Sequence, residues 1–255
     1  MTRKASRLPR SGVSLREQAY AHIQRKIAVG DLRPDTPLSE VVLAKELKMS
    51  RTPVREALSQ LVSEGLLEQT ANRGTLVVQF RRQDIIELYE LREALEVYSA
   101  RKAAQLDLRA MDKQRWQDIC DDLLALKDEL EKSRHAVLNG EQMDRFLTAD
   151  LSFHNMLMRL ARNDRILKVA NDTRLLIHIF GIQRPKYDAA TLTRIHQQHC
   201  AILQAVTGHD QNKATQLLTQ HIQISLEERL DAFDEWEREA SLQKSLPALA
   251  GLSHG

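Results

Sequence analysis

The chain has 255 residues, of which 42% are hydrophobic and 4% aromatic, and its formal net charge is +2. This length allows two ordinary domains, and so few aromatic residues favour helices over sheets. No apolar run approaches the ~20 residues of a membrane-spanning helix, and the first residues lack the apolar core of a signal peptide. We therefore expect a cytoplasmic protein that has no membrane partner.

The N-terminal part of the chain is basic. Residues 1–12 are rich in lysine and arginine without an apolar core, and they predict a disordered basic arm. Residues 13–29 carry apolar side chains four positions apart and predict the first helix. Over residues 1–80 basic side chains outnumber acidic ones, whereas the remainder is slightly acidic. This distribution is expected when only the first domain meets nucleic acid.

The region from residue 38 to residue 78 predicts a helix, a tight turn, a second helix and two short strands around a polar tip. A winged helix-turn-helix has this order of elements, and its second helix enters the major groove of DNA. Ser50 or Thr52 can cap the second helix, while Arg51 and Arg55 project from one of its faces. The opposite face is apolar and comprises Val54, Ala57, Leu58 and Leu61.

This second helix has the chemistry of a DNA-recognition helix. Its N-terminus and hydroxyls suit phosphate, and arginine suits guanine edges or phosphate. The alternative is a surface helix with two solvated arginines, but Arg73 and Gly74 follow at the predicted hairpin tip and favour DNA. The sequence therefore predicts a DNA-binding domain over residues 13–80. Its predicted contact residues are Ser50, Arg51, Thr52, Arg55, Arg73 and Gly74.

This region resembles the winged-helix domain of GntR-family transcriptional regulators. The resemblance rests on Gly30 to Pro34, Leu38-Ser39-Glu40, the run from Ser50 to Leu58, Glu64 to Leu67, and Arg73-Gly74. Asp35 stands where the family usually has glycine, which concerns the local turn. Val41 stands where some members carry a DNA-contacting arginine, so we do not expect that contact here.

Residues 84–238 predict helices without strand alternation, so the fold class is mainly α: a winged helix-turn-helix followed by an all-helical bundle of six or seven helices. The expected helices span residues 84–104, 111–134, 143–160, 164–180, 192–206 and 212–238. Residues 239–255 show little pattern and predict a flexible tail.

Four polar residues fall within the apolar stripes of three of these helices: Asp150, His154, His199 and His221. Buried carboxylate and imidazole groups are costly unless they are paired or bound to metal. The four residues therefore predict a divalent-metal site, with zinc favoured by ligand type and nickel or manganese as alternatives. A buried hydrogen-bonded cluster without metal is the other interpretation.

Arg92 and Glu96 lie on the inner stripe of the first bundle helix. A salt bridge between residues four apart is the simplest interpretation. The functional interpretation is that Arg92 grips the carboxylate of a small organic-acid effector, while the metal holds another oxygen.

The helical half is similar to the FCD-type effector domain of the FadR branch of the GntR family. The similarity rests on Asp150 with Phe153-His154, His199 with Ala201 to Leu203, and His221-Ile222. It implies Asp150, His154, His199 and His221 as metal ligands and an organic acid as effector.

The expected mechanism is that of a repressor. A homodimer formed through the helical domain would place two recognition helices on a palindromic operator about one helical turn apart. The effector would shift the population of dimers able to span both half-sites and release the DNA. Two alternatives are a metal-dependent enzyme that uses the Asp/His tetrad, which lacks a clear general acid or base beside it, and a DNA-architectural protein, which leaves the buried polar residues without a role.

Overall fold

The computed structural model describes residues 13–28, 31–133, 135–180 and 186–250. The predicted basic arm over residues 1–12 and the last residues of the predicted tail lie outside this description. The chain divides into two compact units, Met1–Gln79 and Phe80–Gly255. Within the described residues the chain is mainly α-helical, as the sequence predicts.

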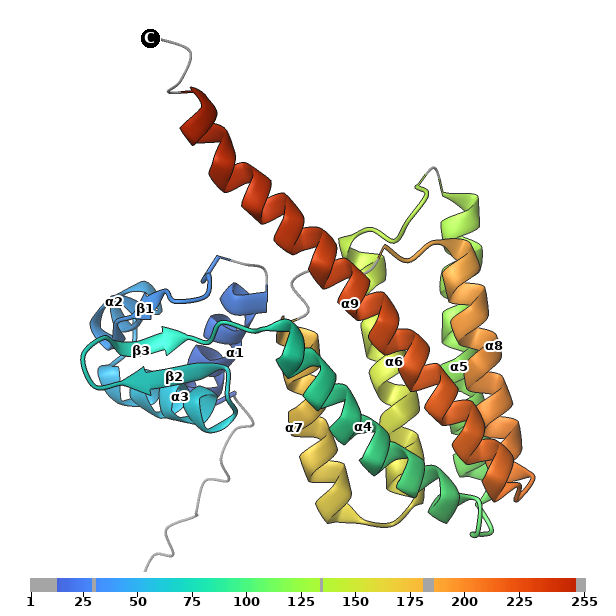
Figure 1. Cartoon of the computed structure of the whole chain (residues 1–255). Helices are drawn as coiled ribbons and strands as arrows, with labels where there is room; N and C mark the ends of the chain where they lie inside the picture. The colour runs from blue at the N-terminus through green and yellow to red at the C-terminus, as the bar shows by residue number, and fades with distance from the viewer. Residues whose placement is uncertain (1–12, 29–30, 134, 181–185, 251–255) are drawn as a thin grey trace, which may run out of the picture. The chain divides into compact units, whose positions relative to one another are not determined.

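The first unit is a winged helix-turn-helix (Figure 1). Its helices are α1 (Leu15–Ala28), α2 (Glu40–Glu46) and α3 (Arg51–Ser63), and its strands are β1 (Pro37–Leu38), β2 (Leu67–Thr70) and β3 (Gly74–Val77). The strands form an antiparallel sheet in the order β1-β3-β2. The wing hairpin is as predicted, and the short β1 is an addition that the sequence pattern did not indicate.

The core of this unit lies between α1, α3 and the wing. The predicted apolar face of α3 is buried, at Val54, Ala57, Leu58 and Leu61. It packs with Ala19, Ile23 and Ile27 of α1, which are completely buried. Ser39 caps α2 by accepting a hydrogen bond from the Val42 backbone N–H. Ser50 occupies the N-cap position of α3, but its hydroxyl makes no capping hydrogen bond.

The turn before β1 keeps the backbone that a glycine would adopt. Asp35 has φ of 61°, and its backbone N–H donates to the Val77 carbonyl over 2.9 Å. Aspartate is among the non-glycine residues that tolerate this left-handed region best. The substitution of the usual glycine therefore leaves the turn in place.

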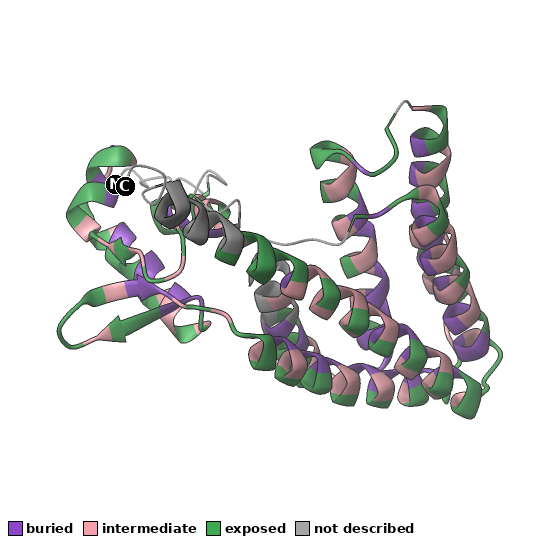
Figure 2. Cartoon of the chain, turned by 45° about the horizontal axis from the view of Figure 1, so that its top comes forward, coloured by how far each residue is buried: buried purple, intermediate pink, exposed green. Residues whose placement is uncertain are grey.

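The second unit is a bundle of six described helices, which agrees with the predicted six or seven. They are α4 (Arg82–Ala103), α5 (Ala110–Lys132), α6 (Gly140–Leu160), α7 (Asp164–Phe180), α8 (Ala189–Thr207) and α9 (Gln211–Ala250). Helix α4 packs against α9, and α5 packs against α8. Figure 2 shows the buried positions along the sides of the helices that face one another. No helix among the described residues is long and apolar enough to cross a membrane.

Capping residues extend two helices beyond their predicted starts. Asn139 and Gln142 form a capping box that starts α6 at Gly140, and Asp188 accepts a hydrogen bond from the Thr191 backbone N–H at the start of α8. Helix α9 runs to Ala250, beyond the expected end near residue 238. The flexibility expected for residues 239–255 stays a prediction.

The buried face of α6 differs from the predicted stripe. The spacing predicts an inward stripe of Leu147, Leu151, Leu157, Met158 and Ala161. The last three are completely buried as expected, but Leu151 is 40% exposed, and Phe153, outside that stripe, is completely buried. The Phe153 ring packs on Trp116 of α5, with ring centroids 5.2 Å apart. Spacing alone did not distinguish the two faces, because leucines occur on both sides of this helix. The Phe153 ring therefore forms an apolar surface against which the polar cluster packs.

Candidate metal centre and nucleic-acid interface

The exposed face of α3 presents both predicted arginines, and one carboxylate holds them. Arg55 donates from Nε and Nη2 to the two oxygens of Glu40, each over 2.9 Å, and Arg51 Nη2 donates to Glu40 Oε2 over 3.2 Å. The arginine side chains remain 59% and 60% exposed. The hydrogen bond from Arg55 keeps the pKa of Glu40 below its usual value; burial opposes it, and the hydrogen bond from Arg51 adds to the lowering.

Glu40 was not predicted as part of this interface. It begins α2, and in the sequence it belongs to the Leu38-Ser39-Glu40 motif of the resemblance, for which no contact was predicted. Its contact with α3 depends on how the two helices cross, which residue spacing does not give.

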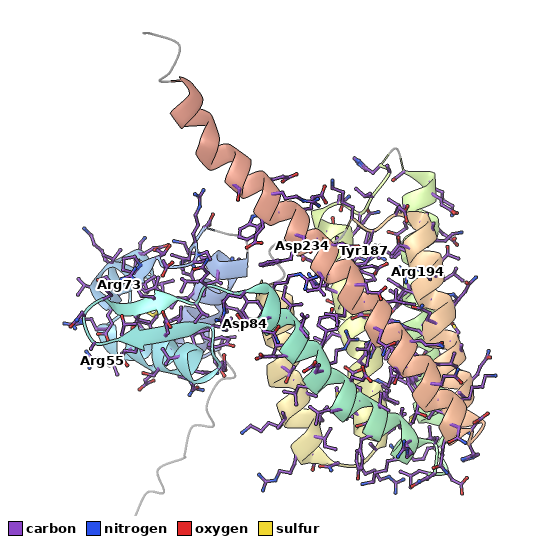
Figure 3. The ribbon with its side chains drawn as sticks, in the orientation of Figure 1. Arg55, Arg73, Asp84, Tyr187, Arg194 and Asp234 are labelled. Atoms are coloured by element: carbon purple, nitrogen blue, oxygen red, sulfur yellow. The ribbon has the colours of Figure 1, made fainter. Side chains whose placement is uncertain are left out.

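The wing tip presents Arg73, with its side chain 61% exposed and its Nη2 3.8 Å from Asp35 Oδ1. Gly74 has φ of 75°, a conformation that favours glycine, at the start of β3. Figure 3 shows Arg55 and Arg73 at the periphery of the first unit. The structure thus leaves Arg51, Arg55 and Arg73 accessible to a partner.

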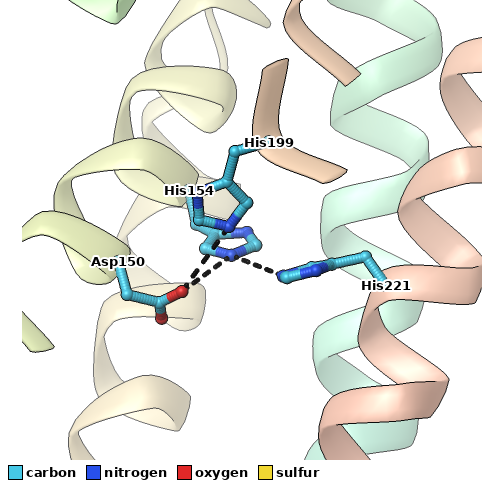
Figure 4. A group of neighbouring side chains, drawn as sticks. All are labelled: Asp150, His154, His199 and His221. Carbon is cyan, nitrogen blue, oxygen red and sulfur yellow. Dashed lines mark hydrogen bonds and ion pairs between the residues drawn. The ribbon is translucent and has the colours of Figure 1, made fainter. Parts of the chain in front are cut away.

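The four residues of the predicted tetrad converge in the second unit (Figure 4). Helix α6 supplies Asp150 and His154, α8 supplies His199 and α9 supplies His221. One ligand atom from each lies within 4.8 Å of all the others. His154 and His199 are fully buried and His221 is 4% exposed, whereas the Asp150 side chain is 27% exposed. One carboxylate and three imidazoles in this arrangement could hold a divalent ion.

Residues outside the tetrad orient two of its imidazoles. His154 Nδ1 lies 2.6 Å from Glu96 Oε2, and His221 Nδ1 lies 2.9 Å from Gln198 Oε1. If each Nδ1–H donates to these oxygens, both Nε2 lone pairs face the centre of the cluster. Glu96 was predicted only as a partner of Arg92, and Gln198 was not predicted at all.

His199 is the member whose environment most needs an explanation. Both of its ring nitrogens are buried and have no hydrogen-bond partner among the described residues, although its Nε2 lies 3.6 Å from Asp150 Oδ1. Its ring stacks on Phe153 with centroids 3.8 Å apart. A buried polar group without a partner in a native protein often marks the place of an ion or water.

The electrostatics of the cluster keep two of its imidazoles, those of His199 and His221, ready to bind an ion. Burial, followed by the charges of neighbouring histidines, lowers the pKa of both His199 and His221 well below the usual value, and Asp150 opposes this only in part. Neutral imidazoles retain the lone pairs that metal coordination requires. The donor set therefore fits a divalent ion, and His199 and His221 are in the neutral form that binds one.

Arg92 lies beside the cluster, with 5% of its surface exposed. Its Nε donates to Glu96 Oε1 over 2.9 Å, so the salt bridge considered as the simplest interpretation is present. Its Nη2 also lies 3.1 Å from His154 Nε2. Burial would lower the pKa of Arg92, but the charge of Glu96 raises it above its usual value. Arg92 is thus a permanent cation fixed at the edge of the tetrad.

A cavity of about 510 Å³ opens onto the cluster, and its lining includes Arg92, Asp150 and His221. Tyr187, Arg194 and Arg229 contribute further polar groups to its wall, and Figure 3 shows Tyr187 and Arg194 at α8 and the segment before it. Sequence reasoning missed these three residues. A signal existed for Arg229, because His221, Ser225 and Arg229 are four positions apart and share a face of α9.

A winged helix joined to a helical bundle with a buried Asp/His cluster and an adjoining polar cavity defines a DNA-binding transcriptional regulator with a separate regulatory unit. Residues 15–77 match the family described as bacterial regulatory proteins, gntR family, and residues 87–224 match the FCD domain. The chain belongs to the GntR family of transcriptional regulators, in its FCD-containing branch. It is therefore a regulator rather than the metal-dependent enzyme considered above.

Characterised relatives agree with this assignment. The chain is 30% identical to the Nta operon transcriptional regulator of Aminobacter aminovorans over 78% of this chain and 87% of the relative. It is 27% identical to the HTH-type transcriptional repressor RspR of Escherichia coli over 81% of this chain and 85% of that protein.

Solved structures share the fold at lower identity. The McbR/YncC structure of E. coli superposes with a TM-score of 0.66 at 19% identity, covering 88% of this chain and 100% of the other. A second neighbour, Lar of Listeria monocytogenes, has a TM-score of 0.60 at 18% identity, covering 88% and 99%.

Proposed function

We propose that this protein is a cytoplasmic repressor that binds a palindromic operator as a homodimer and leaves it when a small organic acid binds at a divalent metal centre. The single observation that carries this proposal is the convergence of Asp150, His154, His199 and His221 beside the cavity, with both His199 nitrogens unsatisfied among the described residues. An ion bound there would supply positive charge and a coordination position for a carboxylate oxygen. Zinc suits this ligand set, with nickel or manganese as alternatives.

Arg92 is the proposed partner for the effector carboxylate. It lines the cavity and is always charged. Its Nη2 now contacts His154 Nε2, the lone pair that a bound ion would take. Once an ion binds His154 Nε2, Arg92 is free to donate from Nη2 to an effector oxygen, while its Nε still donates to Glu96.

The proposed DNA interface is the face of α3 and the wing. Arg51 and Arg55 would contact base edges or phosphates, and Ser50 and Thr52, in the first turn, would add hydroxyl contacts to phosphate. Arg73 and Gly74 would place the wing tip against the sugar–phosphate backbone. Dimerisation through residues 84–238 would set two α3 helices roughly 34 Å apart, one helical turn of DNA.

Native mass spectrometry tests the metal centre. The wild-type protein, supplied with zinc, should be a dimer with one divalent ion per chain, and His199→Ala should lose the ion. His196→Ala is the matched control, because His196 lies on the same helix but contacts Cys200. Wild-type protein that takes up neither zinc, nickel nor manganese would refute the metal centre. If His199→Ala retained its full metal content, His199 would not be one of the metal ligands.

Palindromes selected from a random duplex pool test the DNA interface. Arg55→Ala should abolish binding to them and leave the dimer intact, whereas Arg101→Ala, an exposed arginine on α4, should bind like wild type. Normal binding by Arg55→Ala would show that α3 is not the recognition helix.

A further inference from the structure

Arg229 of α9 is a cation inside the effector cavity whose charge no described carboxylate balances through an ion pair. It lines the cavity together with Arg92; burial would lower its pKa, but the phenols of Tyr89 and then Tyr187 raise it. Its Nη1 is buried and has no hydrogen-bond partner among the described residues. A buried guanidinium nitrogen left this way is costly unless something else supplies the missing acceptor.

The other arginines of the cavity wall are already paired. Arg92 is held by Glu96, and Arg194 forms an ion pair with Glu228. Asp144 also lines the cavity and has an interaction partner of its own. Arg229 is instead surrounded by the phenols of Tyr89 and Tyr187, and the positive charge of Arg92 opposes its own. Among the described residues it is the cavity arginine that lacks a paired carboxylate.

The pKa of Tyr89 indicates the same excess of positive charge in the cavity. Burial would raise the pKa of this phenol, yet the charges of Arg229 and then Arg92 lower it below its usual value. The Arg92 guanidinium carbon lies 5.4 Å from the centre of the Tyr89 ring. Because Arg92 and Arg229 both line the cavity, one small molecule bound there can reach both.

We propose that Arg229 binds a second acidic group of the effector, so that the effector is a dianion of the dicarboxylate class. This inference rests on the proposed function and deepens it. One carboxylate is held at Arg92 and the tetrad, and the other accepts hydrogen bonds from Arg229, whose planar guanidinium suits two carboxylate oxygens. A cavity of about 510 Å³ accommodates such a molecule, since ligand sites commonly enclose roughly 300–1,000 Å³.

Isothermal titration of the zinc-loaded dimer tests this specificity. The probes are the straight-chain diacids from succinate to suberate and the monoacids with the same numbers of carbons, from butyrate to octanoate. At least one diacid should bind tenfold or more tightly than its matched monoacid, which corresponds to about 1.4 kcal/mol. Arg229→Met should abolish this advantage and leave the monoacid Kd within about twofold of wild type. Arg101→Met, which alters an exposed arginine of α4 outside the cavity lining, should keep the preference.

The outcomes separate this inference from the proposed function. Monoacids that bind as tightly as diacids, or a diacid preference that survives in Arg229→Met, would overturn the role of Arg229 and leave the effector site standing. Binding of neither series to the wild type would overturn the organic-acid effector site itself, and the inference with it.

The melting temperature without ligand distinguishes a binding role from a structural one. Arg229→Met should melt at or above the wild-type temperature, because methionine replaces a half-buried cation whose Nη1 lacks an acceptor with an apolar side chain of similar length. Tyr89 would keep its hydrogen bond to Ser225, which spans 3.1 Å. A fall of several degrees would show that Arg229 holds the bundle together, and would overturn the inference.

Discussion

The substitution Glu40→Gln should weaken sequence-specific DNA binding while strengthening non-specific binding. Glu40 receives two hydrogen bonds from Arg55 and one from Arg51, at 2.9, 2.9 and 3.2 Å. Arg55 donates to this carboxylate from Nε and Nη2, and the rest of its five N–H donors remain available to DNA. Glutamine can accept only part of this set, and it carries no charge to hold the two guanidiniums.

The magnitude follows from two opposing effects. Ordering a long side chain only on binding costs about 0.5–1.5 kcal/mol, so the two released arginines together cost about 2 kcal/mol. Removing a carboxylate some 8 Å from a phosphate in a water-like medium gains about 0.5 kcal/mol. Specific affinity should therefore fall about tenfold, whereas non-specific affinity, which needs no fixed arginine geometry, should rise about twofold. Folding stability should change by less than about 1 kcal/mol, because the ion pairs are largely exposed.

Fluorescence anisotropy with a selected palindrome and a scrambled duplex of equal length, at a fixed salt concentration, measures both effects. Glu56→Gln is the matched control, because Glu56 is an exposed acidic residue of α3 itself. It makes the same change in net charge and should raise both affinities modestly. An increase of both affinities in Glu40→Gln, equal to that of the control, would refute the reasoning, because Glu40 would then act only through its charge.

Two further predictions concern the helical unit. Glu96→Gln removes the charged acceptor shared by Arg92 Nε and His154 Nδ1, and competition with a zinc chelator should show a metal affinity lower by about 10–100-fold; an unchanged affinity would mean that Glu96 does not orient His154. Phe153→Ala, at a fully buried ring between Trp116 and His199, should cost about 3–5 kcal/mol in urea unfolding, whereas Phe153→Leu should cost less and retain metal. Equal losses for alanine and leucine would contradict a packing role.

The features that could be predicted from the sequence depend on the order of the residues and on helical periodicity. The contacts that could not be predicted depend on how the helices cross. The ordered run around Arg51 and Arg55 was enough to predict the winged helix. Helical spacing was enough to predict that Asp150 and His154 face inward, and the structure brings both next to His199 and His221. Their role as metal ligands stays a prediction.

The misses have a common physical cause. Glu40 contacts Arg55, which lies fifteen positions later in the sequence. Arg229 of α9, the last helix, interacts with Tyr89 of α4, the first helix of the bundle. Such partners depend on interhelical angles and rotamers, which no single-helix pattern specifies. Leu151 was misplaced for a related reason, since leucine is tolerated on either face of a helix.

The uneven burial of the tetrad has a kinetic consequence. His154 and His199 are sealed by the helices around them, while Asp150 is partly exposed and borders the cavity with His221. An ion bound by these residues would exchange with solvent by way of the cavity, along the route that the effector would occupy. Effector and ion would then leave in a fixed order, effector first. A saturating effector should accordingly slow the loss of metal to a chelator.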